Sequence, residues 1–331
     1  MTPSTPACSM TDPVLLRVES LRLALSDDVP LVEDLDFEIH AGETLAIVGE
    51  SGCGKSLTAL SLMGLLPPGI RCASGRVVFQ GEDLGSWPEA RYRDMRGHRM
   101  SMIFQEPMTS LNPVLTIGEQ LREVLQRHLK LKDREALAKA HDLLAMVQIA
   151  DPGARLRSYA HQLSGGQRQR VMIAMALACP TQLLIADEPT TALDVTVQAD
   201  ILALLGEQKR QRQLAMLLVT HDFGVVAQVA DRVLVMYAGR KIEEGPVRQV
   251  LADPRHPYTQ RLLRARPSAR QDRLQRLAEI PGLVPAPQER GVGCPFASRC
   301  DQVQPICRLR LPDFTDHGRG HQSACAAHDA R

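Results

Sequence analysis

The chain contains the sequence Gly49-Glu-Ser-Gly-Cys-Gly-Lys-Ser56, directly after an apolar run, Thr44–Val48. It matches the pattern G-x-x-x-x-G-K-[ST], and its surroundings predict a strand before the loop and a helix from about Lys55. Glycines let backbone N–H groups approach phosphate oxygens without a Cβ in the way, and a helix start adds partial positive charge. The stretch therefore predicts a phosphate-binding loop, in which Lys55 reaches the terminal phosphates and the Ser56 hydroxyl binds Mg²⁺.

A second candidate site ends another apolar run, Leu183-Leu-Ile-Ala-Asp-Glu188. A buried strand would deliver Asp187 to the edge of a sheet, where its carboxylate can hold Mg²⁺ through water. Glu188, the next residue, can polarise a water molecule for in-line attack on a terminal phosphate. The alternative is that both carboxylates cap the following helix, but capping alone would not require the apolar run. Together the two motifs predict a Mg²⁺-dependent nucleotide hydrolase.

Apolar, β-rich runs alternate with helical patterns through most of the chain. The expected strands are Thr44–Val48, Leu183–Ala186, Met216–Val219 and Val233–Tyr237, and the expected helices are Val195–Arg212 and Phe223–Ala230. This alternation predicts an α/β fold, with a mostly parallel sheet and helices on both faces. Leu15–Leu25 and Leu31–Ile39 predict strands of a smaller sheet. Gly118–Ala178 includes the amphipathic stretch Asp133–Gln148 and predicts a helical insert.

The composition limits the partners and the location. The chain of 331 residues is 44% hydrophobic and 23% charged, a globular balance, and its net charge of +1 gives no field that would favour nucleic acid. Met1–Pro13 is rich in Thr, Ser and Pro and lacks a charged start before an apolar run, so it predicts a disordered leader and not a signal peptide. No run of apolar residues is long enough to span a membrane, so a membrane role would require other subunits to cross it.

The chain also contains Leu163-Ser-Gly-Gly-Gln167, which resembles the signature sequence of ABC ATPases. In the order of that family, Gln105 resembles the Q-loop residue, Ala192-Leu-Asp194 the D-loop and His221 the switch histidine. The resemblance covers residues 14–254 and implies one ATPase domain there. It implies a P-loop NTPase (RecA-like) core with an antiparallel β subdomain and an α-helical subdomain, which we expect at residues 88–165.

The resemblance implies a role for each motif. Two ATPase domains are expected to pack head to tail, with each ATP between the phosphate loop of one and the signature turn of the other. Glu188 is expected to be the catalytic base, His221 to bind the γ-phosphate and orient Glu188, and Gln105 to sense Mg²⁺ and the attacking water. The expected ATP-binding residues are Gly49, Glu50, Ser51, Gly52, Cys53, Gly54, Lys55, Ser56, Leu57 and Asp187. The expected contacts across the dimer come from Ser164, Gly165, Gly166, Gln167 and Asp194, and the expected Mg²⁺ ligands are Ser56, Gln105 and Asp187.

The adenine contact departs from the family pattern. ABC ATPases usually stack adenine on an aromatic residue upstream of the phosphate loop, but Leu25–Asp28 contains no Phe, Tyr or Trp. Either an aliphatic side chain such as Leu25 packs on the base, or nucleotide affinity and base selectivity are weaker.

Several stretches resemble the ATPases of bacterial dipeptide and oligopeptide importers, a subfamily that includes nickel and glutathione importers. They are Gly49–Ser56, Phe104–Pro113, Arg255–Thr259 and Gly293–Cys300, the last of which resembles a C-terminal extension typical of that branch. The resemblance implies a peripheral subunit at the cytoplasmic face of the inner membrane. Its implied partners are a second ATPase, two membrane-spanning permease subunits and an extracytoplasmic solute-binding protein. The subfamily often pairs two different ATPase chains, which favours a heterodimer, and a homodimer is the alternative.

A soluble ABC ATPase that acts in translation or DNA repair is the alternative from another class. Such translation factors usually carry two ATPase domains in one chain, and such repair ATPases a long coiled coil. This chain has one set of motifs and no heptad run. The sequence therefore favours the importer.

Four of the eight cysteines, Cys294, Cys300, Cys307 and Cys325, cluster in residues 255–331, which we expect to form a C-terminal extension. Thiolates suit both zinc and iron–sulfur clusters, and the spacing matches neither a ferredoxin nor a zinc-finger pattern. His317, His321 and His328 could add ligands. The resemblance favours a 4Fe-4S cluster with a structural role; zinc and an unliganded cysteine group are the alternatives.

Overall fold

A computed structural model describes residues 13–106, 110–191, 193–265 and 280–328. The expected leader, Met1–Pro13, lies outside the described residues except for Pro13. The strands are β1 (Val14–Leu25), β2 (Pro30–His40), β3 (Thr44–Val48), β4 (Ile70–Phe79), β5 (Glu82–Asp83), β6 (Met100–Ile103), β7 (Leu183–Asp187), β8 (Ala215–Thr220), β9 (Arg232–Tyr237), β10 (Arg240–Pro246), β11 (Thr315–Asp316) and β12 (Gln322–Ser323). The α-helices are α1 (Lys55–Leu62), α2 (Glu89–Met95), α4 (Ile117–Leu129), α5 (Asp133–Met146), α6 (Pro152–Leu156), α7 (Gly165–Ala176), α8 (Val195–Arg212), α9 (Phe223–Val229), α10 (Val247–Ala252) and α11 (Pro257–Arg264).

The larger sheet has the order β11-β12-β10-β9-β3-β8-β7-β6 among the described residues. Its central strands, from β9 to β6, are parallel. Every residue of β3, β7 and β8 is buried, as expected for strands that are covered on both faces. The predicted parallel sheet of an α/β fold is confirmed. The carboxyl ends of β3, β6, β7 and β8 lie at one edge of this sheet.

The smaller sheet is antiparallel and has the order β2-β1-β4-β5. Buried and exposed residues alternate along much of β1 and β2, so one face of these strands packs inward. That face shares a core with one side of the larger sheet, where Phe79 and Leu45 are both fully buried. The predicted strands Leu15–Leu25 and Leu31–Ile39 are confirmed within a residue or two.

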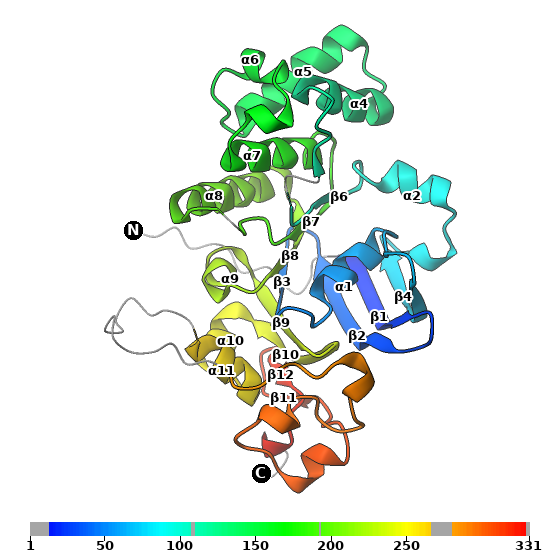
Figure 1. The fold of residues 1–331 in the computed structure, drawn as a ribbon, viewed down its shortest axis with the longest axis vertical. Coiled ribbons are helices and arrows are strands. Elements are labelled where there is room, and N and C mark those ends of the chain that lie inside the picture. The colour runs from blue at the N-terminus through cyan, green and yellow to red at the C-terminus, as the bar shows by residue number, and fades with distance from the viewer. Residues whose placement is uncertain (1–12, 107–109, 192, 266–279, 329–331) are drawn as a thin grey trace.

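Helices α4 to α7 lie together at one end of the molecule, beyond β6 and β7 (Figure 1). Helix α4 begins with a capping box: the Thr116 hydroxyl accepts from the Glu119 N–H, and the Glu119 carboxylate accepts from the Thr116 N–H. The apolar faces of these helices join the core on the other side of the larger sheet, with Leu121 and Leu144 fully buried. This region is the helical insert that the sequence predicts.

Residues 280–328 lie at the opposite end of the molecule and join the larger sheet (Figure 1). Strand β12 pairs with β10 in antiparallel register, Glu243 opposite Ser323 and Glu244 opposite Gln322. Buried His321 accompanies this pairing, with its Nε2 atom 2.8 Å from Oε1 of Glu243. The C-terminal strands thereby cover the edge of β10, which would otherwise present unpaired backbone groups.

Some elements differ from the sequence predictions. Helix α1 ends at Leu62, so Leu65 lies after the helix and not on it. Strands β4, β6 and β10 were not predicted. Strand β10 (RKIEEGP) has no apolar pattern, because a buried position is occupied by Glu244 and not by an apolar residue. The Glu244 carboxylate is neutralised by Arg232 and Lys241.

We predict that Gly75→Ala destabilises the smaller sheet more than Gly81→Ala. Both glycines have positive φ (+92° and +80°), but a Cβ at position 75 would lie 2.4 Å from the Ser20 carbonyl oxygen, while position 81 has open space. The left-handed backbone costs about 1–2 kcal/mol in each variant, and overpacking adds about 1–3 kcal/mol at position 75. Urea unfolding measures the difference, and equal midpoints would contradict it.

Candidate active site

The phosphate-binding loop joins β3 to α1, as the sequence predicts. Lys55 is 6% exposed, and its Nζ atom donates to the carbonyl oxygens of Gly49 (2.8 Å) and Glu50 (3.0 Å). A Cβ at position 49 would lie 2.2 Å from the Met236 carbonyl oxygen of β9, so only glycine fits there. The carbonyl oxygens of the loop thus hold the ammonium group of Lys55. The terminal phosphates of a bound nucleotide would compete with these carbonyl oxygens for the ammonium group.

Ser56 and Asp187 come together although they lie 131 positions apart in the sequence. The Ser56 hydroxyl donates to Oδ1 of Asp187 over 3.1 Å. Burial at the end of β7 raises the pKa of Asp187, against the hydrogen bond from Ser56, which lowers it. A hydroxyl and a carboxylate at this distance are oxygen ligands of the kind that Mg²⁺ takes beside a nucleotide.

Glu188, which follows β7, contacts residues that follow two other strands of the sheet. Gln105, after β6, places its Nε2 atom 3.4 Å from Oε2 of Glu188, and His221, after β8, places its Nδ1 atom 3.3 Å from Oε1. The backbone of Glu188 has φ +48°, in the left-handed region that non-glycine residues adopt less readily than glycine. The three residues that the sequence names as catalytic therefore form one cluster.

Thr191 is a member of this cluster that the sequence analysis missed. Its hydroxyl donates to Oε2 of Glu188 over 2.7 Å. Burial alone would raise the pKa of Glu188, but the hydrogen bonds from Thr191 and His221 and the charges nearby outweigh it, so the pKa lies below its ordinary value. Glu188 is therefore a carboxylate at neutral pH, the form that a general base requires. Only its spacing from Glu188 within Asp-Glu-Pro-Thr-Thr could have indicated Thr191.

The signature turn lies at the start of α7, away from the phosphate loop (Figure 1). Ser164 caps this helix: its hydroxyl accepts from the Gln167 N–H over 3.3 Å. Ser164 and Gly165 are exposed, and no atom would crowd a Cβ at Gly165. Gln169, two residues beyond the motif, donates to the Pro189 carbonyl oxygen over 2.6 Å and links α7 to the turn after Glu188.

Other predicted site residues have local structural roles in this chain. The Asp194 carboxylate caps α8 by accepting from the Val197 N–H over 2.9 Å. Ala192, in the same motif, lies outside the described residues. Leu25 is half-buried at the turn between β1 and β2, and the exposed Asp28 pairs with Arg71.

The four C-terminal cysteines line one small cavity of about 10 Å³, together with His256 and Pro257. Burial, and then the neighbouring thiols of Cys307, Cys325 and Cys300, raise the pKa of Cys294 to about 11. In the described part of the chain, no three His, Cys, Asp or Glu residues are arranged so as to hold a metal ion. The thiols therefore face a common space without converging at ligand distances.

The predicted histidine ligands are directed elsewhere. His321 contacts Glu243 on β10, and the Nε2 atom of His317 lies 2.8 Å from the Ser323 hydroxyl. Both rings thus support the pairing of the C-terminal strands. The side chain of His328 lies outside the described residues.

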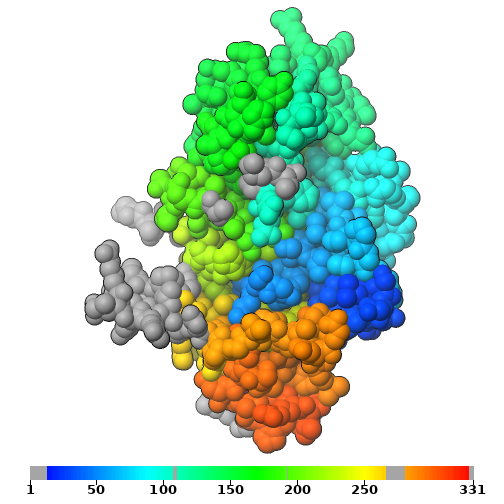
Figure 2. All heavy atoms as spheres, in the orientation of Figure 1, coloured from blue at the N-terminus to red at the C-terminus, as the bar shows by residue number. Residues whose placement is uncertain are grey.

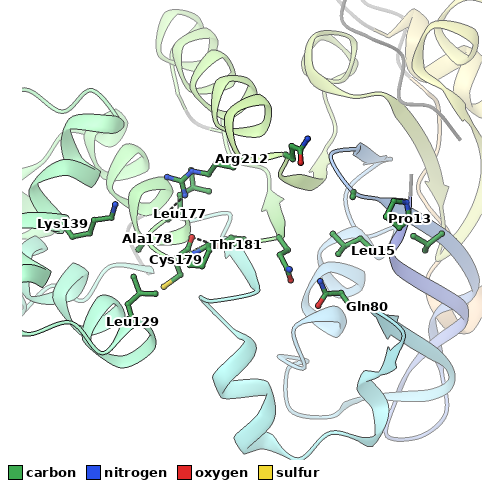
Figure 3. Close-up of a pocket in the computed structure, with 15 residues that line it drawn as sticks. Pro13, Leu15, Gln80, Leu129, Lys139, Leu177, Ala178, Cys179, Thr181 and Arg212 are labelled. Carbon is green, nitrogen blue, oxygen red and sulfur yellow. Dashed lines mark hydrogen bonds between the residues drawn. The ribbon is translucent and has the colours of Figure 1, made fainter. Parts of the chain in front are cut away.

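A cavity of about 930 Å³, drawn in Figure 3, has none of these site residues in its lining. Gln182 and Gln213, which line it, precede the amino ends of β7 and β8, whereas the phosphate loop follows the carboxyl end of β3. Cys179, Thr181 and Arg212 also line it. This cavity is therefore separate from the nucleotide site.

No helix in the described ranges combines the length and the apolar character needed to cross a bilayer.

Comparisons with known proteins agree with the geometry. A family model described as ABC transporter matches residues 32–191, and one described as Oligopeptide/dipeptide transporter, C-terminal region, matches residues 242–307. The dipeptide transport ATP-binding protein DppD of Bacillus subtilis is 46% identical over 96% of this chain and 96% of that protein. The oligopeptide transport ATP-binding protein OppD of Salmonella typhimurium is 48% identical over 94% of this chain and 93% of that protein.

Solved structures share the fold over most of the chain. CbiO1 of Clostridium perfringens, part of the ABC transporter complex CbiONQ, superposes with a TM-score of 0.64 at 28% identity, covering 73% of this chain and 92% of that one. The ATP-binding cassette MJ0796 bound to ADP and Pi, a dimer, gives 0.63 at 25% identity, covering 70% and 98%. The chain therefore belongs to the ABC transporter family, as an ATPase that carries the C-terminal region of oligopeptide and dipeptide transporters.

Proposed function

We propose that this ATPase drives uptake of dipeptides or oligopeptides across a bacterial inner membrane, as the nucleotide-binding subunit of an importer. The observation that carries ATP hydrolysis is the cluster of Gln105, Thr191 and His221 around the Glu188 carboxylate. The C-terminal match at residues 242–307 supports peptides as the cargo. Nickel or glutathione uptake by the same motor is the alternative.

The proposed mechanism uses the groups as the structure places them. The N–H groups of the loop from Gly49 to Leu57 bind the phosphates, and Lys55 exchanges its carbonyl partners for phosphate oxygens. Ser56 and Asp187 would hold Mg²⁺, which neutralises the charge that develops on the phosphates. Glu188 accepts a proton from the attacking water, while Gln105 and His221 fix the orientation of that water and of the carboxylate.

A second ATPase domain completes the site in this proposal. Ser164 caps α7 and Gly165 and Gly166 are its first residues, so an anion presented by another chain could bind at this helix N-terminus, where Ser164 and Gly165 are exposed. Gln167 and Asp194 would lie in the same interface. The dimeric neighbour bound to ADP and Pi supports this arrangement. We propose a heterodimer with a related ATPase, two permease subunits, a solute-binding protein and a peripheral position on the cytoplasmic face of the membrane.

We further propose a functional division of the chain. Residues 14–254 would form the ATPase domain, with the helical subdomain at residues 88–165. Residues 255–331 would form an extension in which Cys294, Cys300, Cys307 and Cys325 bind a thiolate-ligated metal centre. Their shared cavity and thiol chemistry support a metal; we favour a 4Fe-4S cluster and keep zinc as the alternative. Because the pKa of Cys294 is high, binding would release thiol protons.

We predict that Glu188→Gln leaves ATP binding intact and lowers hydrolysis by at least about 100-fold, the contribution expected of a general base. The amide keeps the size of the side chain but cannot accept the proton. Phosphate release under saturating Mg²⁺·ATP measures hydrolysis, and retention of labelled ATP measures binding. Hydrolysis at the wild-type rate would contradict the role of Glu188.

We predict that the tagged chain, extracted with mild detergent from its native membranes, co-purifies with two multi-spanning proteins. The untagged strain is the control. Recovery with ribosomes or DNA and without membrane proteins would contradict the importer and favour a soluble ABC ATPase.

We predict that anaerobically purified protein contains iron and sulfide. It should absorb broadly near about 400 nm, as iron–thiolate chemistry leads us to expect. Replacing Cys294 and Cys307 by serine should abolish the absorbance, while Cys72→Ser, an exposed cysteine far from the cavity in sequence, should preserve it. Stoichiometric zinc without iron would overturn the cluster, and protein without either metal would overturn any metal centre.

A further inference from the structure

The side chain of Glu50 points from the phosphate loop to the C-terminal segment, residues 280–328. Its carboxylate forms a two-pronged ion pair with Arg299: Nη1 lies 2.7 Å from Oε2 and Nη2 lies 3.1 Å from Oε1. The Arg299 side chain is only 4% exposed. Figure 2 shows the orange C-terminal segment packed directly against the blue N-terminal part of the chain. An arginine 249 positions away in the sequence therefore contacts a side chain of the phosphate loop directly.

Every N–H group of the Arg299 guanidinium has an acceptor. Nε donates to the Pro281 carbonyl oxygen (3.0 Å), Nη2 also donates to that of Ile280 (2.9 Å), and Nη1 also donates to the Tyr237 hydroxyl (3.2 Å). A guanidinium has five N–H groups, and with the two bonds to Glu50 all five are used. Lysine cannot reproduce this planar set of donors. Three of these hydrogen bonds orient the guanidinium independently of Glu50.

The backbone of Glu50 is held by Tyr258 of α11, which packs against the C-terminal segment. Its N–H donates to the Tyr258 hydroxyl over 2.8 Å. Tyr258 is fully buried and packs against Tyr237 and Phe296, with ring centroids 4.7 Å and 5.4 Å away. Phe296 lies three residues before Arg299, so one turn of the C-terminal segment supplies a ring that packs on Tyr258 and the arginine that pairs with Glu50.

Glu50 connects these contacts to the lysine of the phosphate loop. Its carbonyl oxygen accepts from Lys55 Nζ (3.0 Å) and from the Cys53 N–H (3.3 Å). A displacement of Glu50 would therefore move the carbonyl oxygen that positions Lys55 and would change the loop where it receives phosphate. Arg299 does not itself contact any group that we assign to phosphate binding other than Glu50.

A simple tether between the two parts of the chain would not need this chemistry. Burying an ion pair has a desolvation cost that apolar side chains of similar size would avoid. A fully bonded Arg–carboxylate pair instead fixes distance and orientation. The arrangement is therefore suited to hold the loop in one geometry.

We propose that Arg299 is a positioning residue for ATP binding, which acts through Glu50 to hold the phosphate loop in its nucleotide-competent geometry, so that the nucleotide site is complete only with the C-terminal segment in place. This inference rests on the proposed function, because it assigns a role in the same nucleotide site. It also explains why the loop carries a glutamate directly after Gly49, a position at which the phosphate-binding pattern accepts any residue.

The test is a double-mutant cycle on the full-length chain with Arg299→Gln, Glu50→Gln and the double variant. Titration with a fluorescent ATP analogue and Mg²⁺ measures affinity, and steady-state hydrolysis by the assembled importer gives KM and kcat. We expect each single variant to bind about tenfold more weakly, mainly through KM, and the double variant to be no weaker than either single one. Additive losses in the double variant, or an affinity equal to wild type in Arg299→Gln, would overturn the proposal.

Arg261→Gln is the matched control. Arg261 also pairs with the C-terminal segment, through Asp301 at 3.2 Å, but it belongs to α11 and has no hydrogen bond to the phosphate loop. Its affinity should equal that of wild type; a tenfold loss there would show that any weakening of the segment suffices and would overturn the specific role of Arg299.

Arg299→Lys keeps the test decisive if Arg299→Gln fails to fold. Lysine retains the positive charge but cannot donate all the hydrogen bonds of the planar guanidinium, so it should weaken ATP binding several-fold, while unchanged affinity would count against the proposal. The wild-type titration separates the two levels of inference. Absence of ATP binding by the wild-type chain would refute the proposed function, whereas wild-type binding that Arg299→Gln retains in full would refute only the positioning role.

Discussion

The active site depends on the parallel pairing of β3, β8, β7 and β6. Parallel strands bring their carboxyl ends to one edge, and the residues that follow those ends are the phosphate loop, His221, Glu188 and Gln105. Strands β3, β7 and β8 are covered on both faces and are mostly apolar, and the polar groups of the site lie at or just after their carboxyl ends. The distance of 3.1 Å between Ser56 and Asp187 is a consequence of this register.

The same constraint explains the state of the charged groups at this edge. Lys55 is buried, no carboxylate among the described residues is at hydrogen-bond distance from it, and its ammonium group donates to the carbonyl oxygens of its own loop. Asp187 is buried deeply enough for its pKa to rise, while Glu188, one residue farther along, has donors that lower its pKa. Adjacent carboxylates thus have opposite electrostatic environments, which suits one to bind metal and the other to accept a proton.

Much of this could be predicted from the sequence because the decisive signals are local. The glycine-lysine loop, the apolar run before Asp187 and the signature turn each occupy a few consecutive residues. The missed elements depend on distant partners: β10 is a strand whose buried glutamates are in contact with Arg232, Lys241 and His321. No periodicity in its sequence indicates that pairing. The contact between His321 and Glu243 is a further example, because these residues lie 78 positions apart in the sequence.

The contact between Glu50 and Arg299 is the clearest case of a functional pair that local patterns cannot reveal. Glu50 occupies a position of the loop motif that accepts any residue. Arg299 lies between Phe296 and Cys300, in a segment whose cysteines indicate a metal site and give no sign of a role for the arginine. Their geometry means that the order of the C-terminal segment and the geometry of the phosphate loop are not independent. A group that binds Cys294 and Cys300 would order the turn on either side of Arg299. Arg299 also donates to the Pro281 and Ile280 carbonyl oxygens, so one route from the cysteine cavity to Lys55 passes through its ion pair with Glu50.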